Sequence, residues 1–164
     1  MQEIMSWDEF FFRHVYLAAL KSRDPRTKIG AVLVKDGIII SEGMNGFPRK
    51  VLDLPERYAD QETKYKFICH AENNAILNAC RHGISTIGSV CYTNSIPCCE
   101  CAKSLIQAGI LEIVVHKQWP EMNEKWQESI KISKIMFKES GVKIRVFDKK
   151  LGLIGLNDGK EIEV

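Results

Sequence analysis

Residues 69–83 read CHAENNAILNACRHG, and residues 95–109 read SIPCCECAKSLIQAG. In each stretch, cysteine and polar residues precede a segment typical of a helix. A glycine follows this segment and acts as a helix stop signal. Pro97 stands where proline favours the first turn of a helix. We therefore expect a helix that starts near Cys69 or His70 and ends by Gly83, and another over 97–108.

The residues at these two helix starts form a pattern typical of a catalytic zinc site. Two residues separate Cys98 from Cys101, which puts both sulfurs on one side of the first turn, where free backbone N–H groups favour thiolates. With His70 they make three ligands, and three rather than four leave a position open for water. Glu72 is displaced enough to miss the metal and to move protons instead. We expect one zinc ion per chain.

Either half of this pattern alone would be weak evidence. A bare Cys-x-x-Cys is more often a structural knuckle or a redox pair, and a lone His-x-Glu is mostly chance. A second alternative is a non-enzyme in which zinc only staples an interaction domain, but such a site would have a fourth ligand and no need for Glu72. Together, His-x-Glu and Pro-Cys-x-x-Cys are the signature of zinc-dependent deaminases of nucleobases.

Outward from these helices, strands and helices alternate. Ser6 and Glu9 form a capping box that opens a helix to about Ser22, and Asp36-Gly37 joins two apolar runs as a hairpin. The other expected elements are strands at 29–35, 38–40, 89–93, 112–115 and 142–147, a loop over 43–66 of the kind that often forms a lid, a helix over 122–139 and a candidate hairpin over 151–164. We expect one domain, 1–164, of α/β class with three layers, α/β/α: a mixed five-stranded sheet with helices on both faces.

Composition excludes other classes of protein. The chain has 164 residues, of which 45% are hydrophobic and 27% charged, as is usual for one globular domain. The net charge of +2, with basic and acidic residues mixed, supplies no basic face for nucleic acid. There is no apolar run of about 18 residues and no pattern of a signal peptide, so we expect no membrane partner. The six cysteines are then expected to be reduced thiols in a cytoplasmic protein.

Beyond the zinc motif, the chain resembles the deoxycytidylate (dCMP) deaminases of the cytidine-deaminase superfamily over residues 7–147. The matching segments are 21–25 (KSRDP), 28–32 (KIGAV), 43–48 (GMNGFP), 64–65 (KY), 69–76 (CHAENNAI) and 97–110 (PCCECAKSLIQAGI). The zinc motif is shared by the whole superfamily, whereas the segments at 43–48 and 70–76 are more particular to dCMP deaminases. The resemblance implies the three-layer cytidine-deaminase-like fold.

The resemblance also implies a reaction, the hydrolysis of dCMP to dUMP and ammonia, which supplies dUMP for thymidylate synthesis. Glu72 would take a proton from the attacking water, protonate N3 of cytosine and then carry a proton to the leaving amine. Asn45 would hold the sugar hydroxyl, and Ala71 would also contact the substrate. The loop before the first strand is the candidate site for the 5′-phosphate, with Ser22, Arg23 and Lys28 as its donors. The alternatives are Arg49 or Lys64 of the loop before His70, or a neighbouring subunit.

The family implies further a homo-oligomer, a hexamer or a dimer, with dCTP and dTTP as candidate effectors. Met44 replaces the family's usual aromatic residue in the region tied to that control, which leaves regulation open. Relatives with a second zinc carry extra His and Cys before His70, and residues 45–67 contain neither. Trp119 and Trp126 are expected in the core or at a subunit contact.

The alternative substrates are dCTP, a modified dCMP or, less favoured by the net charge of the chain, adenosine in tRNA.

Overall fold

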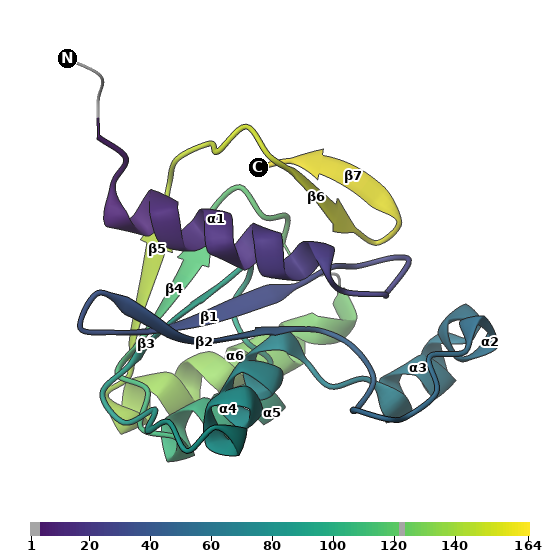
Figure 1. Ribbon diagram of the computed structural model, residues 1–164, viewed down its shortest axis with the longest axis horizontal. Helices are drawn as coiled ribbons and strands as arrows, with labels where there is room; N and C mark the ends of the chain where they lie inside the picture. The colour runs from purple at the N-terminus through teal and green to yellow at the C-terminus, as the bar shows by residue number, and fades with distance from the viewer. Residues whose placement is uncertain (1–3, 122–123) are drawn as a thin grey trace.

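The structure, a computed structural model, describes residues 4–121 and 124–164, and its elements follow one another along the chain as Figure 1 shows. In order they are α1 (Trp7–Leu20), β1 (Gly30–Lys35), β2 (Ile38–Met44), α2 (Pro55–Ala59), α3 (Gln61–Phe67), α4 (Ala71–Arg81), β3 (Val90–Thr93), α5 (Cys99–Gln107), β4 (Glu112–His116), α6 (Glu124–Ser140), β5 (Lys143–Phe147), β6 (Ile154–Asn157) and β7 (Lys160–Glu163). The expected helix over 122–139 corresponds to α6, although its first two positions lie outside the described residues.

Five strands form one mixed sheet in the order β2-β1-β3-β4-β5. Strand β1 pairs antiparallel with β2 and with β3, whereas β3, β4 and β5 are parallel to one another. Parallel neighbours need a long connection, which α5 and α6 provide. The five-stranded mixed sheet is as the sequence predicted.

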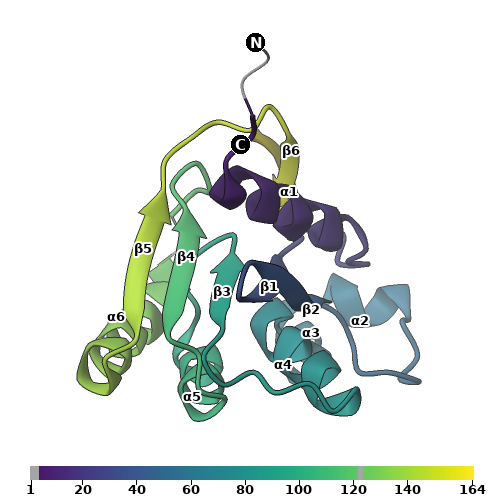
Figure 2. The same ribbon diagram turned by 60° about the vertical axis from the view of Figure 1, so that its left-hand side comes forward.

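Helices cover both faces of this sheet (Figures 1 and 2): α4, α5 and α6 lie on one face, and α1 lies on the other. Side chains alternate along the strands, so β1 contributes to two separate cores. Ala31 and Leu33 pack in the core under α4, α5 and α6, while Val32 and Val34 pack with Phe12 of α1 in the second core. The three-layer α/β/α fold is therefore confirmed.

Two Asp-Gly pairs each make a tight hairpin. Asp36 and Gly37 have φ angles of 51° and 76°, and Asp158 and Gly159 have 49° and 77°. Positive φ at both central residues is the geometry of a type I′ turn, whose twist matches that of the flanking strands. The first turn joins β1 to β2, and the second joins β6 to β7 in a sheet of their own.

The sequence prediction was wrong for residues 43–66, expected as a loop. Strand β2 continues to Met44, and α2 and α3 occupy most of the remainder. Pro55 opens α2 at its first turn, and the Asp60 side chain caps α3 by accepting a hydrogen bond from Thr63 N at 2.8 Å. These helices have five and seven residues, too few for a periodic apolar pattern to identify. Within the described part of the chain, no helix is long and apolar enough to cross a membrane.

Candidate active site

The first part of the site is the start of α4, which lies directly against β2. A Cβ atom on Gly43 would stand 2.3 Å from the carbonyl oxygen of Ala71, so only glycine permits this approach. Three side chains then tie the helix to the strand: Asn74 Nδ2 donates to Met44 O, Asn78 Nδ2 to Glu42 O and Ser41 Oγ to Ala75 O, each at 2.7 Å. This packing holds His70, the N-cap residue, and buried Glu72 in the first turn.

The second part is the start of α5, where Cys98 is the N-cap residue and Cys101 is fully buried. The backbone N–H of Cys99 donates to Ser129 Oγ of α6 at 2.9 Å. One of the free N–H groups of the first turn is therefore satisfied from a neighbouring helix, which fixes where α5 begins.

These two helix starts bring together the three predicted metal ligands. His70 Nδ1 lies 3.3 Å from Cys98 Sγ and 3.4 Å from Cys101 Sγ. Among the described residues, these three form the one group of histidine, cysteine or carboxylate side chains that could hold a metal ion, and their ligand atoms all lie within 4.8 Å of one another. Tetrahedral zinc with bonds of about 2.0–2.3 Å spaces its ligands by roughly 3.5–3.8 Å, so the donor set fits zinc.

The pKa values of the titratable side chains in this cluster are strongly shifted. The hydrogen bond from Cys101 lowers the pKa of Cys98 to about 4, and the same bond, with burial, raises the pKa of Cys101. Burial lowers the pKa of His70, but the hydrogen bond to Cys98 and the charge of Glu72 outweigh it and leave that pKa raised. A thiolate beside an imidazole is the chemistry that a soft divalent metal selects.

Glu72 lies beside the cluster without belonging to it. Its Oε2 is 3.6 Å from Cys101 Sγ, and the residue is only 5% exposed. Burial raises the pKa of this carboxyl group, an effect that His70 partly opposes. A carboxyl group with a raised pKa can hold and release a proton near neutral pH, as a general acid or base requires.

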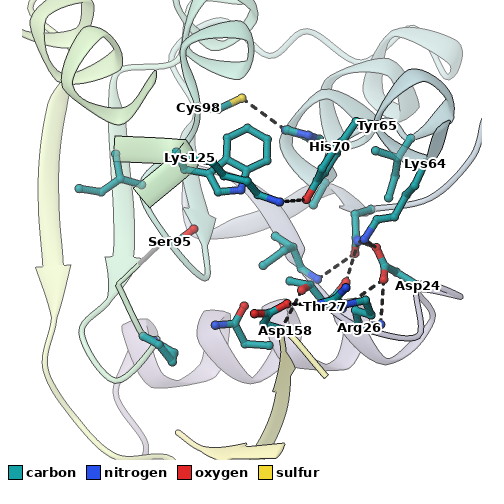
Figure 3. A pocket seen from close by; sticks show the side chains of 18 of the residues that line it. Asp24, Arg26, Thr27, Lys64, Tyr65, His70, Ser95, Cys98, Lys125 and Asp158 are labelled. Atoms are coloured by element: carbon teal, nitrogen blue, oxygen red, sulfur yellow. Dashed lines mark hydrogen bonds and ion pairs between the residues drawn. The ribbon is translucent and has the colours of Figure 1, made fainter. Parts of the chain in front are cut away.

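The cluster opens into a cavity of about 350 Å³. Figure 3 shows His70 and Cys98 at one end and Arg26 and Asp158 at the opposite end, and Glu72, beside Cys101, also lines the cavity. Trp126 of α6 also lines the cavity and stands edge-on to the His70 ring, with centroids 5.7 Å apart. The cavity therefore has a metal-binding end with an aromatic wall and a charged end.

The family model described as the cytidine and deoxycytidylate deaminase zinc-binding region matches residues 5–117. This chain belongs to the cytidine and deoxycytidylate deaminase family. It is accordingly a zinc-dependent hydrolytic deaminase, in agreement with its group of one histidine and two cysteines.

Relatives along most of the chain agree with this assignment. The chain is 35% identical over 160 residues to the deoxycytidylate deaminase of Mus musculus, a match that covers 93% of this chain and 85% of that protein. It is 34% identical over 160 residues to the deoxycytidylate deaminase of Homo sapiens, with the same coverage. The dCMP deaminase of cyanophage S-TIM5, solved with dCMP and dUMP, shares the fold with a TM-score of 0.66 at 23% identity, over 88% of this chain and all of that one.

The predicted substrate residues lie in different surroundings. Ala71 and Asn45 line the cavity. The Asn45 side chain donates to Thr27 O at 2.8 Å and to Asp24 at 3.3 Å, and accepts from Ile29 N at 2.8 Å. Asn45 thereby fixes residues 24–29, and its contact with a sugar hydroxyl stays a prediction.

The three predicted phosphate donors are not among the residues that line the cavity. Ser22 is buried and donates to Asn45 O at 2.8 Å, and Lys28 Nζ donates to Ser22 O. Arg23 is largely exposed and pairs with Asp53 at 3.3 Å. In this structure, then, Ser22 and Lys28 support the loop from behind, and Arg23 faces solvent.

The cationic residues that do line the cavity are Arg26, Lys64, Lys125 and Lys160. Lys64, the alternative named above, is 5% exposed and pairs with Asp24 at 2.5 Å. Sequence reasoning missed the other three, and it expected Trp126 in the core or at a subunit contact rather than beside His70. The net charge and the local spacing contain no signal for them, because they come from a loop, from α6 and from the C-terminal hairpin.

Proposed function

We propose that this enzyme deaminates the free nucleotide dCMP to dUMP and ammonia. The observation that carries the proposal is the single cavity that joins the His70, Cys98 and Cys101 cluster and buried Glu72 to a charged far end. A nucleotide has its reacting amino group on the base and its charge on the phosphate. The relatives named deoxycytidylate deaminase, at 34–35% identity over nearly the whole chain, support this substrate.

His70, Cys98 and Cys101 would hold the zinc ion. When bound, zinc lowers the pKa of water from about 15.7 to about 7 and so supplies a nucleophile at neutral pH. Glu72 carries the protons: it accepts one from the attacking water and delivers it to N3 of cytosine, then transfers another to the amino group on C4. The C4–N bond breaks, ammonia leaves, and C4 keeps the oxygen as the carbonyl group of uracil.

The surroundings of Glu72 suit this exchange. The pKa of Glu72 is raised because the carboxyl group is buried, which makes its carboxylate a stronger base toward the attacking water. Trp126 stands edge-on to His70 and forms an aromatic wall at the reacting end of the cavity. Cys91 is fully buried behind the site. It lies near enough to Glu72 for the negative charge of the Glu72 carboxylate to contribute to the raised pKa of the Cys91 thiol.

Asn45 acts as a positioning residue for the nucleotide end. Its amide ties together Asp24, Thr27 and Ile29, and Asp24 in turn pairs with buried Lys64 of α3. This network gives the loop at 24–29 a defined shape where a sugar and its phosphate would lie. One acceptor position of Asn45 Oδ1 is left for a hydroxyl group, because the amide oxygen has two lone pairs.

The proposal includes a homo-oligomer in the cytoplasm, with dCTP and dTTP as candidate effectors. Apolar side chains on the outside of α1 support self-association: Trp7, Leu17 and Leu20 are each at least 59% exposed. Light scattering after size exclusion, with and without each triphosphate, measures the oligomer and its response.

A substrate comparison tests the proposed function. Purified protein is assayed for ammonia release with deoxycytidine, dCMP, dCTP, a 5-substituted dCMP and adenosine in tRNA, each with and without dCTP and dTTP as effectors. We expect the highest kcat/KM for dCMP. A higher value for dCTP or for the substituted dCMP would transfer the proposal to that nucleotide, and activity on tRNA alone would contradict it.

A further inference from the structure

The hairpin β6–β7 lies outside the central sheet and forms one wall of the active-site cavity. Four of its residues line that cavity: Asn157, Asp158, Lys160 and Ile162. Figure 1 shows the hairpin beside α1, folded back from the end of β5. A segment at the very end of the chain is thus placed opposite the zinc ligands.

Hydrogen bonds dock this hairpin onto the loop at 24–29. They run from Lys28 N to Leu156 O at 2.9 Å, from Gly159 N to Arg26 O at 2.7 Å and from Asp158 N to Thr27 Oγ1 at 3.0 Å. The Arg26 and Asp158 side chains also form an ion pair. Two of these bonds join main chain to main chain and the third reaches the Thr27 side chain, so the hairpin is held to the loop at successive residues.

The base of the hairpin is anchored in the core. Val164 is fully buried and Leu151 is 5% exposed, and their backbones are joined by a hydrogen bond of 2.9 Å from Leu151 N to Val164 O. Gly155 permits the close approach of Trp119, because a Cβ atom there would stand 2.9 Å from the indole ring. The hairpin is therefore a fixed part of the cavity wall, able to hold a side chain in position.

The partners of the charged groups along the cavity show which of its cationic side chains lack a hydrogen bond or an ion pair. Lys64 is neutralised by Asp24 and Arg26 by Asp158, and Lys125 donates to Tyr65 Oη at 2.5 Å. Among residues 4–121 and 124–164, Lys160 is the one cationic side chain of the cavity for which the structure shows no hydrogen bond or ion pair. Lys160 belongs to the same hairpin as Asp158, and Figure 3 shows Asp158 at the end of the cavity away from His70 and Cys98.

We infer that the C-terminal hairpin is part of the nucleotide-binding site, with Lys160 as the residue that recognises the 5′-phosphate and so makes the enzyme select nucleotides over nucleosides. The inference rests on the proposed function, since it assumes that the cytosine ring lies at the Glu72 end. With the base there, the phosphate extends toward the charged end, where Lys160 supplies an unpaired ammonium group. Asp158, beside it, opposes phosphate binding while it neutralises Arg26.

Two substitutions should therefore act in opposite directions. Lys160→Gln should lower kcat/KM for dCMP by about 10- to 100-fold, the effect of one hydrogen bond to a charged group, and leave deoxycytidine within about twofold. Asp158→Asn removes the competing carboxylate and frees Arg26, so the KM for dCMP should fall. Asparagine tolerates the positive φ of this turn position, so the hairpin itself should remain intact.

Lys150→Gln is the matched control, because Lys150 is exposed and lies outside the cavity lining. All variants are compared with wild type on dCMP and deoxycytidine. An equal loss on both substrates in Lys160→Gln, or no loss on dCMP, would overturn the inference. A phosphorus NMR titration with inorganic phosphate adds a readout without turnover: binding should weaken in Lys160→Gln and not in Lys150→Gln. If wild type does not deaminate dCMP, the proposed function fails, and the titration still decides the role of Lys160.

Discussion

The two ends of the active-site cavity are built in contrasting ways. At the metal end, His70, Glu72, Cys98 and Cys101 come from the starts of two helices, of which α4 packs against β2 and α5 packs against α6. At the far end, the charged groups come from a loop, a short helix and a C-terminal hairpin, and Arg26 and Asp158 are both around half exposed.

This contrast separates chemistry from recognition. The proposed reacting groups sit on helices packed against the sheet, where sub-ångström placement can be maintained and where burial shifts their pKa values. The proposed recognition groups sit on a loop, a short helix and a hairpin that lie outside the central sheet. The predictions that follow test this division, from the largest expected effect to the smallest.

Loss of a metal ligand should have the largest effect. Cys101→Ser should release zinc and lower activity by more than about 10⁴-fold, since enzymes accelerate their reactions by about 10⁶-fold or more. The variant should also melt at a lower temperature, because metal binding contributes to folding. Elemental analysis and calorimetry measure both. Cys80→Ser is the control, since Cys80 is exposed and away from the cluster, and a zinc-loaded, active Cys101→Ser enzyme would refute the ligand assignment.

Removal of the proton carrier should come next. Glu72→Gln should keep one zinc per chain, the fold and the affinity for dUMP, while kcat falls by about 10²–10⁴-fold. Steady-state kinetics and titration calorimetry separate the two effects. Glu100→Gln serves as control because Glu100 lies between the cysteines but is exposed and pairs with Lys103. Near wild-type turnover in Glu72→Gln would mean that another group moves the protons.

A methyl group at Gly43 tests whether the packing of α4 positions the metal end. Gly43→Ala places a Cβ within 2.3 Å of Ala71 O, so α4 must shift, and we expect a loss of about 1–3 kcal/mol of stability together with weaker zinc binding. Urea unfolding and zinc competition with a chelator measure these. At Gly46 a Cβ meets no atom within 4 Å, so Gly46→Ala should change little. Equal behaviour of the two variants would show that the contact is unimportant.

Acid should lower the free energy of unfolding through His116, which lies on the side of the molecule that carries the hairpin. His116 accepts from Tyr16 Oη at Nδ1 (2.7 Å) and donates from Nε2 to Lys149 O (2.8 Å), just before the hairpin. Burial lowers the pKa of His116 below its ordinary value of 6.5. The unfolded chain therefore binds the proton first as pH falls. This contribution to stability is present above pH 6.5 and is lost below it, by up to about 1.4 kcal/mol per pH unit, until the folded pKa is reached.

Urea unfolding at pH 7.5, 6.5 and 5.5 measures that effect. His116→Gln should be less stable at pH 7.5, yet lose less stability than wild type between pH 6.5 and 5.5. His82→Gln is the control, because His82 is exposed at the end of α4. Parallel pH profiles for wild type and His116→Gln would exclude His116 as the source.

Sequence alone predicted which residues would form a metal-binding group, and the structure brings His70, Cys98 and Cys101 together. Short motifs with fixed spacing identified His70, Cys98, Cys101 and Glu72, since each half of the site is confined to five residues or fewer at a helix start. The Asp-Gly pairs likewise predicted both hairpins, because a type I′ turn is a property of two adjacent residues. The elements of the central sheet followed from short apolar and β-branched runs for the strands, and from capping residues and closing glycines for the longer helices.

The tertiary structure alone decided the recognition end. Arg26, Trp126 and Lys160 are up to 134 positions apart in the sequence, and no local pattern places them around one cavity. Local reasoning favoured Arg23 and Lys28 for their charge, but the turn at 24–28 directs Arg23 outward and Lys28 back onto Ser22. Local sequence determines turns, caps and ligand spacing because those interactions lie within a few residues. Which side chains share a cavity depends on how distant segments pack, and here the buried C-terminus and its hydrogen bonds to the loop decided it.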